Sequence, residues 1–459
     1  MTRAFLFTAL AALGAWATSR NATAACSEEE VGALLQMNPT VPLAQNLSIL
    51  DFLEELTRAS VPNELTALRR RFVEYYREAG SEITRSAPTD LGQVVDCVPF
   101  LKQPALLWAT REEKHEALEL WAESEEFEDQ NMEYYGCARD EIPLPRPSLH
   151  ALRLGLVQEF RKTGSPTGGL WPATGSRPQL SLLQSEGHDC RTIKPPHPGP
   201  PNYTYSTSPI CKTHDSHQAF TILEVGGSLP VPEVPTSGGH TLNQMWWKGL
   251  PPQSELPVSM EAGWLASDPD GGGTVGTRLF VYSTPNAYLP KDDCEGGNHY
   301  DHWGGFVHYP GTPALGVYST KEVRSVFIYQ TVGPSQGVPE RVEFYLAPLD
   351  TNYRKTGRVE SKQLVGYWPR RHYCHGFPNH EDLLLYTGLE VYVPSQCPGT
   401  PRTASGRILG WGTHWNHDHP HLSYPMVKGA GKEAVFLATS MQDPRVRRRS
   451  ERADGVMWP

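Results

Sequence analysis

Hydrophobic residues recur every three or four positions through much of the N-terminal third of the chain, which is the spacing of an amphipathic helix. A charged stretch over residues 112–129 has the same helical character, and Ser148 is suited to cap a helix over residues 149–162. We therefore expect residues 25–204 to be mostly helical. The apolar positions of the clearest segment, between residues 46 and 80, are Leu50, Leu53, Leu56, Leu65, Leu68, Phe72 and Tyr76.

Beyond Gly164 the apolar residues alternate with polar ones in short runs, which are separated by glycine, proline and other turn residues. Repeated short strands of this kind are typical of antiparallel sandwiches and barrels. The sequence thus predicts a mainly β domain over residues 205–445. Its expected strands lie at residues 219–224, 260–265, 278–284, 323–332, 341–347, 389–393 and 434–441.

The composition agrees with a β-rich chain of more than one unit. Among 459 residues there are 41 glycines and 41 prolines, a share well above that of a typical helical protein. At about 150 residues per domain, the length corresponds to two or three units. The formal net charge of −10 is spread evenly along the chain, which argues against nucleic acid as a partner.

The N-terminus has the features of a signal peptide over residues 1–24. Arg3 supplies positive charge, residues 4–17 form an apolar run too short to span a bilayer, and Ala22 and Ala24 fit a cleavage site. A lipoprotein-like site at residues 23–26 is a weaker alternative. We expect a secreted, extracellular protein that has no membrane contact after signal removal, and we expect it to be a monomer.

Eight cysteines are scattered along the chain without a C-x-x-C pair. In an exported protein this arrangement predicts disulfides, because metal sites need closely spaced ligands. Residues 195–201 form a proline-rich junction that resembles a linker or a cleavable site. Residues 446–459 form a basic tail, which we expect to be disordered. The cysteines, whose pairing stays open, are Cys26, Cys97, Cys137, Cys190, Cys211, Cys294, Cys374 and Cys397.

Two glutamates stand out by their position within the expected strands. Side chains alternate between the two faces of a strand, so Glu261 lies opposite the face that carries residues 260, 262 and 264. Glu390 likewise lies opposite the face of its apolar neighbours. Gly263 and Gly388 leave space beside the two carboxylates. Strand phase alone favours two solvated glutamates on an outer face.

Seven short motifs follow one another between residues 240 and 436. They are HTLNQMW (240–246), SMEAGW (259–264), TRLFVYST (277–284), GGFV (304–307), GYWP (366–369), TGLEV (387–391) and GAGKEAVF (429–436). In this order they resemble the neprosin family of glutamic endopeptidases. Upstream, residues 95–105 resemble that family's activation peptide, and residues 179–193 resemble the segment that follows it.

The resemblance implies an antiparallel two-sheet β-sandwich over residues 205–445 and a removable pro-region over residues 25–204. It also implies that Glu261 and Glu390 are the catalytic residues. Two carboxyls held close cannot both ionise, so one keeps a proton while the other activates a water. We choose Glu261 as the base. The implied reaction is cleavage of a protein or peptide after proline, in acid, without a cofactor or metal.

Four further residues are candidates for substrate contact. Gln244 lies on the strand before Glu261, where it is either an oxyanion donor or a hydrogen-bonding residue of the sheet. Trp246, Trp264 and Tyr282 either line a cleft for an apolar or proline-containing segment or belong to the core, where aromatic residues at strand spacing are more common. The sequence leaves both alternatives open.

Several positions depart from the family pattern, among them Tyr386 and Thr387 in the second glutamate motif. Trp303 stands where the partner of a loop cysteine is expected, and Leu389 replaces a glycine beside Glu390. Residues 414–421 combine histidine, asparagine and aspartate, which suits a solvated loop better than a metal site. The alternative to a peptidase is a non-catalytic β-sandwich that binds polysaccharide or cell-wall material through its aromatic face.

Overall fold

The computed structural model describes residues 48–123 and 135–162, and beyond them the strands and many of the turns that join them. The signal peptide, the proline-rich junction, the histidine-rich loop and the basic tail lie outside the described residues. In the second part of the chain the described ranges are 190–191, 203–207, 210–212, 218–225, 240–251, 257–267, 276–285, 288, 298–319, 323–333, 338–348, 363–373, 376–377, 384–392, 403–410 and 432–437.

Helices form in the N-terminal region where the apolar spacing predicted them. Of the predicted apolar positions, Leu56, Leu65 and Phe72 are buried, whereas Leu50 lies on the outer side and is 78 % exposed. The charged stretch is helical up to Glu123, and residues 124–129 lie outside the described residues. The helices are α2 (Ile49–Arg58), α3 (Asn63–Ala79), α4 (Arg111–Glu123) and α5 (Leu149–Leu154).

Two features of this region correct the sequence prediction. The helix expected over residues 149–162 is capped by Ser148 as predicted, but it ends at Leu154 because Gly155 adopts a left-handed φ of 68°. The region also contains an antiparallel sheet of order β1-β2-β3, which the sequence did not predict. These strands are β1 (Arg85–Pro88), β2 (Val94–Pro99) and β3 (Glu141–Pro145).

A disulfide joins Cys97 of β2 to Cys137, which confirms for this pair the prediction that the cysteines form disulfides. A buried ion pair, with Arg146 Nη2 2.5 Å from Asp96 Oδ1, also holds the small sheet together. Among the described residues, no helix has the length and apolar character that a membrane span needs.

The rest of the described chain forms two seven-stranded antiparallel sheets, which confirms a mainly β fold. The first sheet has the order β10-β9-β8-β15-β6-β4, with β5 also paired to β15. All but one of its strands lie before residue 300 in the chain. The strands are β4 (Cys190–Arg191), β5 (Tyr203–Thr207), β6 (Ile210–Lys212), β8 (His240–Gly249), β9 (Val258–Ser267), β10 (Gly276–Thr284) and β15 (Leu384–Tyr392).

The second large sheet has the order β11-β14-β13-β12-β7-β16-β17. Every strand predicted from the alternating pattern overlaps a strand of one of these two sheets. Their ends differ by a few residues, as expected where turns define them. The strands of the second sheet are β7 (Gln218–Val225), β11 (Val307–His308), β12 (Val323–Val332), β13 (Arg341–Pro348), β14 (Gln363–Pro369), β16 (Thr403–Gly410) and β17 (Lys432–Leu437).

One hydrophobic cluster draws residues from both large sheets. Met260, Ala262 and Trp264 of β9 belong to it together with Phe327 of β12 and Phe344 of β13. These three β9 residues are the ones that the strand phase placed on one face. Alternation along β9 therefore directs the neighbouring Glu261 to the other face of its sheet.

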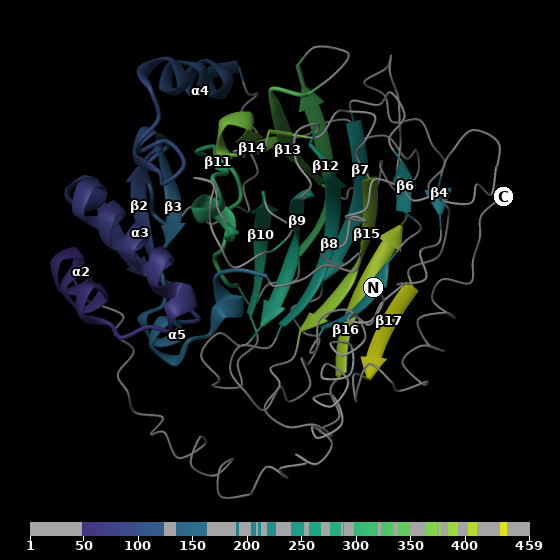
Figure 1. Ribbon diagram of the computed structural model, residues 1–459, viewed down its shortest axis with the longest axis horizontal. Helices are drawn as coiled ribbons and strands as arrows, with labels where there is room; N and C mark the ends of the chain where they lie inside the picture. Colours follow the sequence, from purple (N-terminus) through teal and green to yellow (C-terminus); the bar gives the residue numbers. More distant parts are fainter. Residues whose placement is uncertain are drawn as a thin grey trace, which may run out of the picture.

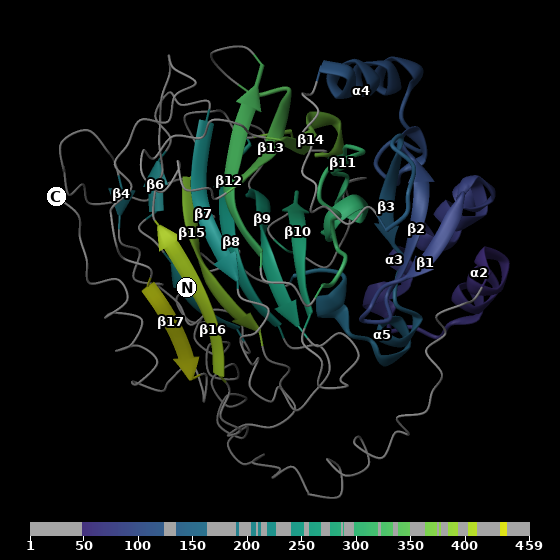
Figure 2. The same ribbon diagram turned by 180° about the vertical axis from the view of Figure 1, so that it is seen from behind.

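The N-terminal region lies beside β10 and β11, as both views in Figures 1 and 2 show. Its contact is apolar: the ring of Trp303 lies 4.5 Å from that of Phe72 and 5.1 Å from that of Tyr75, measured between centroids. A second hydrophobic cluster therefore continues from α3 to β11. The tryptophan that departs from the family pattern is thus part of the contact with the N-terminal region.

Candidate active site

The strand register brings Glu261 and Glu390 to the two strands that flank β8. Trp246 of β8 faces Glu261 in β9, and Leu242 of β8 faces Glu390 in β15. Paired positions point to the same side of a sheet, so both glutamates project from one face. Both side chains are fully buried, which corrects the expectation from strand phase that they are solvated.

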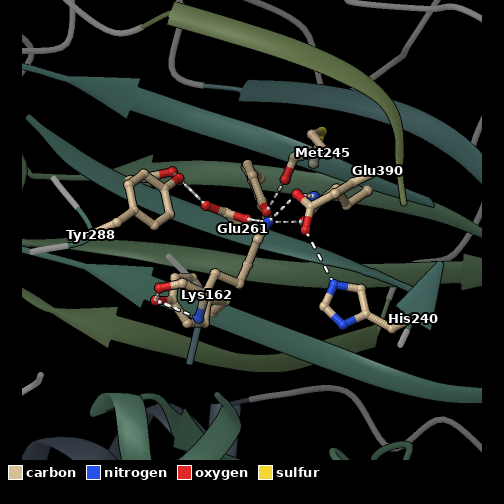
Figure 3. Close-up of polar contacts among 10 residues, drawn as sticks. Lys162, His240, Met245, Glu261, Tyr288 and Glu390 are labelled. Atoms are coloured by element: carbon tan, nitrogen blue, oxygen red, sulfur yellow. Dashed lines mark hydrogen bonds and ion pairs between the residues drawn. The ribbon is translucent and has the colours of Figure 1, made fainter. Parts of the chain in front are cut away.

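Lys162 occupies the space between the two glutamates (Figure 3). The space exists because Gln244, midway between them on β8, faces Gly263 in β9 and Gly388 in β15. Lys162 Nζ lies 2.5 Å from Oε2 of Glu261 and 2.7 Å from Oε2 of Glu390. Two oxygens that contact one nitrogen atom cannot be further apart than the sum of these distances, so the carboxylates form a close pair.

The lysine reaches this position from the N-terminal region. We call residues 159–162 the strap; they begin at the last residue of the short 3₁₀ turn Val157–Glu159, which follows α5. The Tyr300 backbone N–H donates to the Phe160 carbonyl oxygen at 3.1 Å. The Tyr282 hydroxyl accepts from the Lys162 N–H at 3.1 Å and lies 3.2 Å from the Lys162 carbonyl oxygen. Main-chain hydrogen bonds therefore fix the strap in addition to its ion pairs.

The two carboxylates have different polar partners. Glu261 Oε1 accepts a hydrogen bond from Ser259 Oγ at 3.0 Å and another, short one from the Tyr288 hydroxyl. Glu390 Oε2 accepts from Gln244 Nε2 at 3.0 Å, and its Oε1 lies 3.3 Å from His240 Nε2. Figure 3 shows Tyr288 beyond Glu261 and His240 beyond Glu390. A hydroxyl can accept as well as donate, whereas an amide N–H only donates.

Burial dominates the electrostatics of the site. It raises the pKa of Glu261, an effect that Lys162 opposes and that the charge of Glu390 reinforces. Burial lowers the pKa of Lys248 to about 7, and its Nζ lies 5.6 Å from the centroid of the Tyr288 ring. Burial also lowers the pKa of His240 despite the nearby Glu390. The site is a water-poor environment in which protons are easily redistributed.

Three of the four supporting residues lie at the glutamate pair. Gln244 bonds Glu390 and also accepts from Lys162 Nζ at 3.2 Å. The rings of Trp246 and Tyr282 have centroids 5.4 and 5.8 Å from Lys162 Nζ. Trp264 does not lie with them. It belongs to the hydrophobic cluster on the opposite face, so its assignment as a cleft residue was wrong and the core alternative holds.

Sequence reasoning missed Lys162, Tyr288 and His240. The sequence predicts that Lys162 ends a helix, although Gly155 is a recognisable helix stop; the chain instead continues through the 3₁₀ turn Val157–Glu159 and leaves helical structure before Lys162. His240 opens the first family-like motif and faces the site by strand alternation. Tyr288 lies in the turn after β10, where no periodic pattern gives a signal.

Metal binding finds no support in the described residues. The only group with suitable ligand atoms there is Cys97, Cys137 and Glu141, and the two sulfurs are joined in a disulfide. The histidine-rich loop lies outside the described residues. Comparison of the chain with protein-family models and with curated proteins found no match.

Proposed function

We propose that this chain is the secreted precursor of a glutamic endopeptidase of the neprosin kind, in which Glu261 and Glu390 cleave peptide bonds after proline at acidic pH. In this proposal the two large sheets form the sandwich that carries the pair. The observation that supports it most is the contact of both buried carboxylates with the single ammonium group of Lys162. A close pair of carboxyls is the feature that such a mechanism requires.

Once Lys162 withdraws, the two carboxyls are left together in a site of low polarity, and one of them takes up a proton. We assign this proton to Glu261, because burial raises its pKa and the Tyr288 hydroxyl, which can accept as well as donate, can hydrogen-bond its protonated form. Glu390 accepts from the Gln244 amide, a partner suited to an ionised carboxylate. The proposal therefore reverses the choice of Glu261 as base.

In the reaction, Glu390 takes a proton from a water molecule, and the water oxygen bonds to the carbonyl carbon of the substrate. Glu261 hydrogen-bonds the carbonyl oxygen and later gives its proton to the leaving nitrogen, which breaks the C–N bond. Gln244 lies between the two groups and holds Glu390 in place. Trp246 and Tyr282, which flank Lys162, then face the substrate instead.

The lysine makes the precursor inactive because it occupies the position of the reacting water and carbonyl. Lys162 lowers the pKa of Glu261, so Glu261 binds a proton more tightly in the open form than in the closed form. The form that binds protons more tightly is favoured as pH falls. Acid therefore favours withdrawal of the strap.

The alternative, a carbohydrate-binding sandwich, is favoured by no observation in the described part of the chain. An aromatic binding face has to be open to solvent, and Trp246 and Trp264 are exposed by 0 % and 5 % in this form. Hydrolysis decides between the two functions. We therefore keep polysaccharide binding as an outcome of the following test.

The test is hydrolysis of a proline-containing peptide at about pH 3, 5 and 7 by acid-treated protein. Glu261→Gln and Glu390→Gln are each expected to lower the rate by at least roughly 10²-fold, the lower end of the contribution of a general acid or base. Glu343→Gln is the matched control, because Glu343 is also buried but pairs with Arg341 in the second sheet. Unchanged hydrolysis in either site variant contradicts the pair, and no hydrolysis by any form favours the binding protein.

A further inference from the structure

The strap contacts residues at both ends of β10 and on the segments bridged to it. Its Lys162 end meets Tyr282, and its Glu159 end meets Tyr318, whose hydroxyl lies 3.3 Å from Glu159 Oε2. Tyr300 is bridged to Tyr282 on the strand, and Ser319, next to Tyr318, is bridged to Thr277. The strap therefore runs from the start of β10 to the glutamate pair near its end.

Arg278 lies under the Glu159 end of the strap. It is two positions from Phe280 and four from Tyr282, so it shares the face of β10 that carries the site. Its guanidinium carbon lies 5.0 Å from the ring centroids of both Tyr300 and Tyr318. Arg278 is 7 % exposed, and among the described residues its Nε and Nη2 have no hydrogen-bond partner. A buried guanidinium with unused donors is poised for a planar anion.

The distance from Arg278 to Tyr282 along β10 allows one peptide to place one residue at Arg278 and another at the glutamate pair. Arg278 and Tyr282 are four strand residues apart, which is about 13 Å. Three residues of chain, as from Glu159 to Lys162, cover at most about 10 Å, and they cover less here because Glu159 ends the 3₁₀ turn Val157–Glu159 and Phe160 has αR backbone angles. A glutamate side chain can close the remainder, and Glu159 is the acidic residue that the strap supplies at this point.

We infer that Arg278, held between Tyr300 and Tyr318, is a specificity residue that binds an acidic side chain of the substrate. This side chain lies about three residues from the one at the glutamate pair, and Glu159 occupies its place in the precursor. The inference rests on the proposed function. It adds a substrate class, namely peptides with aspartate or glutamate near the cleaved bond.

Neutralisation of Asp301 is a competing role for Arg278. Burial raises the pKa of Asp301 to about 6, while Arg278 opposes the shift. However, Asp301 uses Oδ1 to accept from the Val281 N–H at 2.9 Å. If Arg278 served only to neutralise Asp301, its guanidinium N–H groups would be expected to donate hydrogen bonds to that carboxylate. Its Nε and Nη2 instead have no hydrogen-bond partner among the described residues.

The direct test needs no mutation of the enzyme. Matched peptides carry one proline bond in a neutral background, with either Glu or Gln at each of four positions on either side. At about pH 5.5 we expect one position about three residues from the bond to give at least a tenfold higher kcat/KM for Glu than for Gln. At pH 3 the ratio should approach one, because the ordinary pKa of a glutamate is about 4.3.

Arg278→Gln should bring the Glu-to-Gln ratio at pH 5.5 close to one, and Arg278→Lys should keep part of it. The ratio is internal to each enzyme, so a lower overall activity does not affect it. If the Gln variant does not fold, full-length Glu159→Gln gives the second readout. We expect it to be activated by acid at least threefold faster than the wild type, while Glu64→Gln, which alters the ion pair of Arg161, serves as control.

A ratio within twofold of one at every position, or an unchanged ratio in Arg278→Gln, overturns the inference. So does a Glu159→Gln precursor that is activated at the wild-type rate. None of these results touches the proposed function, which is tested on the neutral peptides by Glu261→Gln and Glu390→Gln. Loss of cleavage in those variants with no acidic preference would leave a peptidase without this subsite.

Discussion

Two buried ion clusters in this protein differ in how their charges are balanced. In the N-terminal region, Asp96 pairs with one cation, Arg146, and also accepts hydrogen bonds from Tyr76 and Ser86 at 3.0 and 2.6 Å. At the candidate site a single ammonium group serves two carboxylates. The first cluster is neutral and complete.

The second cluster is complete only while the strap is in place. Lys162 and Glu261 are 99 positions apart in the chain, and the lysine belongs to a different region from both of its partners. Removing it leaves two like charges together, a state that the site relieves by taking up a proton. On the proposed function, the Asp96–Arg146 pair holds the fold together, whereas the ammonium group of Lys162, shared by two carboxylates, controls access to the site.

The largest expected effect is on the balanced cluster. Arg146→Met should lower the free energy of unfolding of the N-terminal region by about 3–5 kcal/mol at neutral pH, because Asp96 is left buried without its cation. Urea unfolding followed by circular dichroism measures it. Arg153→Met is the control, since its ion pair with Glu55 is exposed and worth at most about 1 kcal/mol. Equal costs for the two variants would refute the distinction.

Acid should weaken the contact between the two regions through histidines. Burial lowers the pKa of His308 and of His372 to about 3. Below about pH 6.5 the unfolded chain gains protons on these residues and the folded chain does not, so stability is complete above that pH and falls from there towards pH 3. His308 also meets the N-terminal region, where Gln103 accepts from its backbone N–H at 2.8 Å.

We therefore expect the melting temperature of the full-length protein to fall between pH 6.5 and 3. His308→Gln should make this slope shallower, because one titrating group is removed. The raised pKa of Glu261 acts in the opposite direction, but it is a single group. Differential scanning calorimetry across this pH range checks the sign, and a melting temperature that rises in acid would show that the histidines are not the controlling groups.

A smaller effect is expected at Gln244. Gln244→Leu removes the amide that donates to Glu390 and keeps roughly the same volume. Loss of one hydrogen bond to a charged group corresponds to about 1–3 kcal/mol, so kcat/KM of the activated protein should fall roughly tenfold to a hundredfold. Gln330→Leu, on β12 of the other sheet, is the control. An unchanged kcat/KM for Gln244→Leu would make Gln244 a residue of the sheet alone.

The sequence predicted those parts of the fold and of the candidate site that depend on local patterns. Alternation along β9 correctly separated Glu261 from Met260, Ala262 and Trp264, and glycine placement correctly indicated space beside the carboxylates. The family resemblance then singled out the two glutamates that the sheet register brings together. Its assignment of activity stays a prediction.

What the sequence did not predict depends on tertiary contacts. The small sheet β1-β2-β3 shows little alternation of buried and exposed residues, because the first five residues of β2 are all buried. Periodicity cannot identify such strands. Lys162 was missed for a related reason: its partners lie far along the chain, and a lysine after a helix normally remains in water.

The central claim is that Lys162 holds a competent glutamate pair closed, and hydrolysis of a proline peptide by full-length protein at about pH 6, without acid treatment, tests it most directly. Lys162→Met should be active where the wild type is latent, and Lys102→Met, which loses only an exposed ion pair with Glu82, should stay latent. Adding Glu261→Gln or Glu390→Gln to Lys162→Met should abolish the activity. A Lys162→Met protein as latent as the wild type, or active without either glutamate, would contradict the account.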